Sequence, residues 1–174
     1  TKPGTGNYLL FQLMHFEYFN ISVRDIAAIA VATQKKDEPL SWREIMGSKE
    51  KMFRLNLESA GAISSLEANL NFWTKEHFNF TLQILFEKIL TRGGIFDFIF
   101  KHEDKIWLLE VVNTLFEFIK DETAKNSKLS LSKLMEMLKM MEKNNIQIPI
   151  YKIIKAENGV NLICLLYTSD AADE

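Results

Sequence analysis

The stretch 79–100, NFTLQILFEKILTRGGIFDFIF, decides the fold class of this chain. Thr81 is a typical residue before a helix, because its hydroxyl can accept a backbone N–H of the first turn. Apolar residues follow at helical spacing, and Gly93 and Gly94 then end the helix, because glycine tolerates the left-handed conformation that closes many helices. The stretch therefore predicts a helix, a glycine break and a short aromatic helix over 95–100.

Two amphipathic helices are expected after this stretch, over 103–125 and 129–145. The apolar face of the first comprises Trp107, Leu108, Val111, Val112, Leu115, Phe116 and Ile119. The inward residues of the second are Leu131, Leu134, Met135, Leu138 and Met141. The methionine-rich run LMEMLKMMEK is typical of core filling, and an interaction face is the alternative.

Helices are also expected before this stretch. Residues 8–19, YLLFQLMHFEYF, are apolar at most positions, so this helix should be largely buried. The next, over 22–34, has Ser22 as its N-cap and Asp25 at its third position. Its apolar stripe comprises Val23, Ile26, Ile29 and Ala30.

A charged turn, KKDEP, is expected at 35–39, before a short helix over 40–51. Ser41 caps that helix, and Glu44 three residues later completes a capping box. A long helix is expected over 52–72, where apolar residues recur at spacings of three and four. Those residues are Leu55, Ala62, Ile63, Leu66 and Leu70, with Gly61 weakening the middle.

After Pro149 the hydrophobic period changes to two. The segment IPIYKIIKAE, the turn pair Asn158-Gly159 and the segment VNLI predict two short strands. The expected organisation is a helical domain over 1–149 and strands over 150–163 that enter a sheet formed elsewhere in the protein.

The last residues, 164–174 (CLLYTSDAADE), do not continue this pattern. Read back into codons, they match the transposase adapter used to build DNA libraries, so we expect them to be a translated adapter and the chain to be a fragment of a longer protein. They include the chain's one cysteine and three acidic residues, so the remainder carries a net charge of +1 instead of −2. Disulfides and thiolate metal sites are therefore not expected, which fits a reducing, cytoplasmic compartment without a membrane span.

Few residues suggest catalysis. The histidines His15, His77 and His102 lie far apart, and none has ligand partners at metal spacing. His15 is expected to be a packed core residue. KPGTGN lacks the strand, lysine and hydroxyl of a phosphate-binding loop. TRGGIF fits either a helix break or a phosphate site at a helix start.

Ser22 and Arg24 form the best candidate site for a DNA phosphate. Free amides, the helix dipole and a guanidinium group meet at this predicted helix N-terminus. An ordinary capped helix is the alternative reading.

The order of these helices, with LLFQLMHFEYFNISVRDIAAIA first and the strand KAENGVNLI last, resembles the helical insertion subdomain in the second motor domain of UvrD/Rep-type superfamily 1 DNA helicases, most closely those of the Bacteroidetes type. The resemblance covers residues 4–163. In that family the final strand runs into a motif that couples ATP to single-stranded DNA, and a helix-hairpin-helix turn with two glycines contacts duplex DNA. The corresponding turn here is Phe19–Ser22, which has neither glycine.

The resemblance implies a mostly α fold, a short terminal strand pair and a parent ATP-dependent helicase that moves 3′ to 5′ in DNA repair or recombination. Duplex DNA and the helicase's own motor domains are the implied partners. ATP and Mg²⁺ belong to the motor domains, so no catalytic, cofactor-binding or metal-binding residue is carried over, and the chain alone should be inactive.

The alternative is a free-standing helical protein-interaction module with an exposed apolar face around Trp73 and Phe78. A helix-turn-helix regulator is less favoured, because no basic recognition helix is evident.

Overall fold

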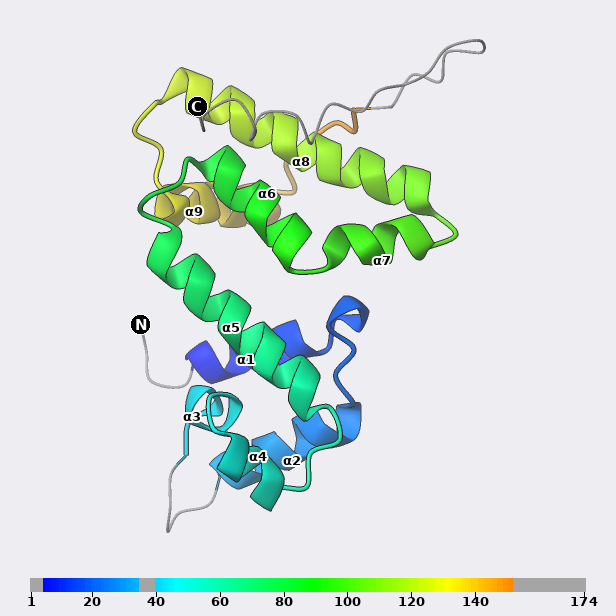
Figure 1. The fold of residues 1–174 in the computed structure, drawn as a ribbon. Coiled ribbons are helices and arrows are strands. Elements are labelled where there is room, and N and C mark those ends of the chain that lie inside the picture. Colours follow the sequence, from blue (N-terminus) through cyan, green and yellow to red (C-terminus); the bar gives the residue numbers. More distant parts are fainter. Residues whose placement is uncertain (1–4, 35–39, 152–174) are drawn as a thin grey trace, which may run out of the picture. The chain divides into compact units, whose positions relative to one another are not determined.

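The protein is mostly α-helical in the computed structural model, which describes residues 5–34 and 40–151 (Figure 1). Within these ranges no strand occurs, and the mostly α class is confirmed. The elements are α1 (Thr5–Met14), the 3₁₀ helix η1 (Glu17–Phe19), α2 (Val23–Thr33), α3 (Trp42–Met46), α4 (Lys49–Arg54), α5 (Ala60–Glu76), α6 (Leu82–Arg92), α7 (Ile95–Lys101), α8 (Lys105–Lys125) and α9 (Leu131–Lys143).

The chain divides into two compact units, Thr1–Phe98 and Ile99–Glu174. The predicted turn at 35–39 lies outside the described residues, as do the adapter-like residues 164–174 and all but the first two residues of the predicted strand segment 150–163. None of the described helices combines the length and the apolar character needed to cross a membrane.

The first unit is built around a core to which α1 to α5 contribute. Ile26 and Ile29 of α2 are fully buried there, as the helical stripe predicted. Val23 of the same predicted stripe is 67% exposed, because it lies at the first position of α2. The buried members of the core are Met14, Ile26, Ile29, Ala32, Trp42, Ile45, Met46, Met52, Leu57, Ile63 and Leu66.

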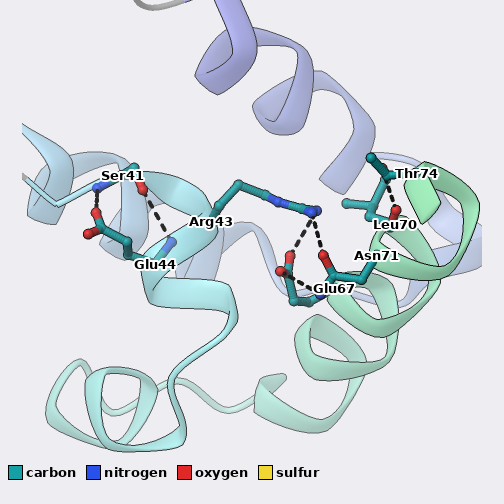
Figure 2. A network of polar contacts seen from close by, with 7 residues as sticks. All are labelled: Ser41, Arg43, Glu44, Glu67, Leu70, Asn71 and Thr74. Atoms are coloured by element: carbon teal, nitrogen blue, oxygen red, sulfur yellow. Dashed lines mark hydrogen bonds and ion pairs between the residues drawn. The ribbon is translucent and has the colours of Figure 1, made fainter.

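A polar network joins α3 to α5 (Figure 2). Arg43 of α3 forms an ion pair with Glu67 of α5 at 2.9 Å between Nη1 and Oε2. Its other terminal nitrogen donates to Oδ1 of Asn71 at 2.8 Å. The Asn71 amide donates to Oε1 of Glu67 at 3.1 Å, which closes the network. The Glu67 side chain is only 13% exposed, so Arg43 neutralises a carboxylate with little access to water.

The start of α3 confirms the predicted capping box, also drawn in Figure 2. The Ser41 hydroxyl accepts the backbone N–H of Glu44 at 3.2 Å, and the Glu44 carboxylate accepts the N–H of Ser41 at 2.7 Å. The hydrogen bond from the Ser41 N–H is the largest cause that lowers the pKa of Glu44. The box therefore stabilises the charged form of Glu44.

The helix predicted after Thr81 is confirmed as α6. The Thr81 hydroxyl accepts the N–H of Ile84 at 3.3 Å, and Gly93 follows the last helical residue. Gly94 has a φ of 74°, in the left-handed region, and α7 begins at the next residue. Gly93 itself is right-handed, but a Cβ there would lie 2.4 Å from the carbonyl oxygen of Ile89.

Two predicted helices are each divided in the structure. The segment 40–51 contains the whole of α3 and the start of α4, because Gly47 ends the first helix and Ser48 caps the second. The long helix predicted over 52–72 is interrupted between Arg54 and Ala60, where Asn56 adopts a left-handed φ of 51°. Asparagine tolerates the left-handed conformation better than most residues. At Asn56 this conformation ends the helix that was predicted to continue.

The prediction that the first helix is largely buried is wrong. Met14 is fully buried, but Tyr8 is 60% exposed, Leu9 63% and Phe16 51%. The helix also ends earlier than predicted, at Met14, and is followed by η1. An apolar composition on all sides implies burial only if other elements cover every side.

The second unit contains α8 and α9, whose positions agree with the predictions. Burial agrees less well, since Trp107 is 54% exposed, Leu131 37% and Met135 46%, while Ile119 and Leu134 are buried as predicted. The unexpected buried residue is Thr114, a polar side chain.

Thr114 connects α8 to the segment after α9. Its hydroxyl donates to the carbonyl of Glu110 at 2.7 Å and accepts the N–H of Tyr151 at 2.9 Å. These two bonds satisfy a hydroxyl that is only 6% exposed. Residues 146–151 have no regular secondary structure.

Candidate functional site

The candidate site lies where the N-termini of α2 and α5 meet in the first unit. The chain enters α2 through a turn after η1, in which Asn20 has a left-handed φ of 51° and its N–H donates to the carbonyl of Glu17 at 2.9 Å. Asparagine adopts the left-handed region more readily than most residues, so the turn does not require a glycine at this position. The turn predicted at Phe19–Ser22 is thus formed without the two glycines of the family that it resembles.

Ser22 is the residue before α2, as predicted, but it does not cap the helix with its side chain. Instead, its backbone N–H donates to the hydroxyl of Ser59 at 2.9 Å. The carbonyl of Ser22 accepts the first helical N–H groups, those of Asp25 and Ile26, at 3.0 and 3.1 Å. Ser22 is therefore held by a residue 37 positions later in the sequence.

Asp25 connects the same two helices from the other side. Its side chain is 1% exposed, and Oδ2 accepts the backbone N–H of Ser59 at 2.6 Å. Ser59 thus accepts from Ser22 with its hydroxyl and donates to Asp25 with its backbone. Buried carboxylates require such partners, since burying an unpaired charge is costly. The sequence places Asp25 at the third position of its helix, and nothing near it in the sequence indicates Ser59 as its partner.

Arg24 points outward between these two anchored residues. Its guanidinium group forms a hydrogen-bonded ion pair with the carboxylate of Glu58, the residue before Ser59. Both side chains are well exposed, 58% for Arg24 and 65% for Glu58. Solvent screens such a pair, so it contributes at most about 1 kcal/mol to stability.

A pocket of about 450 Å³ opens at this junction. It is lined by Asn20, Ile21, Ser22, Glu58, Ser59, Gly61 and Ala62. The first N–H groups of a helix have no acceptor within the helix, and the helix dipole makes this end positive. Two such ends, from α2 and α5, border the pocket, and Glu58 adds one negative charge to its wall.

The other candidates from the sequence do not assemble into a site. His15 is exposed, contrary to the core prediction, and its Nδ1 lies 2.7 Å from the carbonyl of Phe11. Within the described ranges, no group of histidine, cysteine and acidic residues could hold a metal ion. The Gly93-Gly94 pair forms a helix break between α6 and α7, which is one of the two predictions made for TRGGIF.

The methionine run of α9 belongs to the core only in part, since Leu134 is buried and Met137 and Met141 are half-buried. Met135 is 46% exposed and Met140 60%. A pocket of about 330 Å³ lies along this face. Its lining is formed by Lys133, Glu136, Met137, Met140, Met141, Asn144 and Ile146.

Comparison of the chain with protein-family models, with curated proteins and with solved structures finds no match.

Proposed function

We propose that residues 1–149 are the helical insertion subdomain of a UvrD/Rep-type ATP-dependent DNA helicase that acts in the bacterial cytoplasm. ATP and Mg²⁺ would bind to the motor domains of the parent protein, which would move 3′ to 5′. The family resemblance in the order of helices and the mostly α fold support this assignment.

The proposed role of the subdomain is to contact the sugar-phosphate backbone of duplex DNA through Ser22 and Arg24. One observation carries this proposal: Arg24 lies in the first turn of α2, beside a pocket that the N-termini of α2 and α5 border together. Helix N-termini and a guanidinium group both favour phosphate oxygens. Neither group reads bases, so the contact would be independent of sequence.

Two local features are compatible with a phosphate contact. The left-handed Asn20 turns the chain so that α2 begins directly at the pocket. The hydroxyl of Ser22 makes no capping bond to its own helix. A phosphate at the pocket could therefore use this hydroxyl without disrupting α2.

Binding of the full chain to a short, fluorescein-labelled DNA duplex tests the proposal by fluorescence anisotropy. We expect affinity typical of non-specific binding, with a dissociation constant of about 10⁻⁴ to 10⁻⁶ M at physiological salt, and no preference for sequence. Arg24→Ala should weaken binding several-fold at low salt. Arg54→Ala is the matched control, because Arg54 also forms an exposed ion pair in the first unit, with Glu50.

Absence of binding at low salt would contradict the proposal. Equal effects of Arg24→Ala and Arg54→Ala would remove Arg24 as a specific contact. The chain alone should also show no DNA-stimulated ATP hydrolysis, and measurable activity in the purified chain would contradict its assignment as a part without the motor.

The runner-up function is a protein-interaction module. It is favoured by Phe78, just after α5, whose side chain is 85% exposed. Trp73, the other residue of the predicted patch, is half-buried. In this reading Phe78→Ser would abolish binding to a protein partner, and Arg24→Ala would leave that binding unchanged.

A further inference from the structure

We infer that Glu58 gates the duplex-binding site: its carboxylate holds Arg24 in the place of a phosphate, and DNA must displace it to bind. This inference rests on the function proposed above and adds its regulation. The gate would make the isolated site electrically neutral and would set a threshold for binding DNA.

The first argument is chemical. A carboxylate offers a guanidinium group the same kind of charged oxygen acceptors as a phosphate. Glu58 both pairs with Arg24 and lines the pocket at the N-termini of α2 and α5. A negative charge at a helix N-terminus is favourable for the same electrostatic reason that attracts a phosphate. Glu58 therefore satisfies the two positive features that the DNA contact requires.

The second argument is that the gate can open without rearranging the backbone. The hydrogen bond from Ser22 to Ser59 and the one from Ser59 to Asp25 flank the ion pair on both sides. These bonds fix the main chain next to Arg24 and next to Glu58, whether or not the two side chains touch. Only two exposed side chains need to change rotamer for Arg24 to turn to another anion.

The third argument is energetic. Because both side chains are more than half exposed, solvent screens their attraction. A duplex offers a row of phosphates, so one weak pair can be exchanged for another of equal or greater strength. Glu58 would thus lower the affinity for DNA without abolishing binding.

The test compares four chains in the same anisotropy titration: wild type, Glu58→Gln, Glu58→Gln combined with Arg24→Ala, and Glu50→Gln. Glu50→Gln is the matched control, because it removes the same charge from the exposed ion pair with Arg54, at 2.6 Å. Circular dichroism confirms that each variant is folded.

Glu58→Gln should bind the duplex about threefold to fivefold more tightly than wild type, which corresponds to the release of one exposed ion pair. The slope of log affinity against log salt should stay close to that of wild type, because Arg24 contacts the same phosphate in both bound chains. Glu50→Gln should change affinity less than about twofold, because it releases Arg54 from an equally weak pair that does not line the pocket. With Arg24→Ala present, most of the gain from Glu58→Gln should disappear, because there is no guanidinium to release.

The gate and the proposed function fail in different ways. If wild type binds and Arg24→Ala weakens binding, but Glu58→Gln behaves like Glu50→Gln, the gate is overturned and the duplex contact stands. If the gain from Glu58→Gln is undiminished when Arg24 is replaced, the gate is also overturned, since the effect is then one of general charge. If neither wild type nor Glu58→Gln binds at low salt, both proposals are overturned.

Discussion

The backbone N–H of Ser59 donates a hydrogen bond of 2.6 Å to Oδ2 of Asp25, which lies 34 residues earlier in the chain. This bond joins the first turn of α2 to the residue before α5. Because the carboxylate is buried, the bond fixes the relative position of two helix N-termini. The pocket and the Arg24–Glu58 pair depend on that arrangement.

Replacing Asp25 with alanine should destabilise the first unit by about 1 to 3 kcal/mol, because the Ser59 N–H loses its acceptor and a buried group is removed. Urea unfolding followed by circular dichroism measures this change. Glu50→Ala is the control, because the Glu50 side chain is 72% exposed. It should change the unfolding free energy by less than about 0.5 kcal/mol. Equal effects of the two substitutions would contradict the role given to Asp25.

The Arg43–Glu67 pair should show energetic coupling in a double-mutant cycle. Arg43→Ala leaves the largely buried Glu67 carboxylate without its cation, and Glu67→Ala leaves Arg43, which is 37% exposed, in water. Arg43→Ala should therefore cost more than Glu67→Ala. We expect a coupling of about 1 kcal/mol, since Arg43 is partly screened. A coupling near zero would contradict the role given to this ion pair in joining α3 to α5.

Two glycines should respond to alanine in opposite directions. Gly94→Ala should destabilise the chain by about 1 kcal/mol, because its φ of 74° disfavours any side chain. Gly61→Ala should stabilise it by about 0.5 to 1 kcal/mol, because Gly61 lies in α5 and a Cβ there meets nothing within 4 Å. Thermal unfolding of both variants checks this prediction, and shifts of the same sign would contradict it.

The Ser41–Glu44 capping box should make stability depend on pH. The pKa of Glu44 is lowered by its hydrogen bonds with Ser41. The charged form of Glu44 is thus favoured in the folded state. Its contribution to the free energy of unfolding is complete above the ordinary pKa of 4.5, and it is lost as the pH falls through the lower pKa of the folded state. The difference in melting temperature between wild type and Glu44→Gln should therefore shrink on acidification from neutral pH. A difference that stays constant with pH would exclude this linkage.

Local signals in the sequence predicted several helix ends correctly. Ser41 with Glu44, and Thr81 before α6, are satisfied by residues three positions away, so a short stretch contains all the necessary information. Asn56 carried a weaker signal: asparagine tolerates the left-handed conformation, but an apolar pattern continued on both sides of it. The helix break there was consequently missed.

The candidate site was predicted only in part, because its bonds join distant residues. Ser22 has the sequence of an N-cap, yet the hydroxyl of Ser59 accepts its N–H from 37 residues away. Nothing near Arg24 in the sequence indicates its pairing with Glu58. The exposure of Tyr8 and Leu9 could not be predicted either, because apolar residues on every side of a helix do not indicate which side is buried.

The salt dependence of duplex binding by wild type and Arg24→Ala tests the central claim most directly. Anisotropy titrations between about 50 and 200 mM salt give the slope of log affinity against log salt for each chain. If Arg24 contacts a phosphate, the slope of the variant should be shallower by about one unit. Two chains that bind with equal affinity and equal slope would contradict the claim that this surface holds DNA.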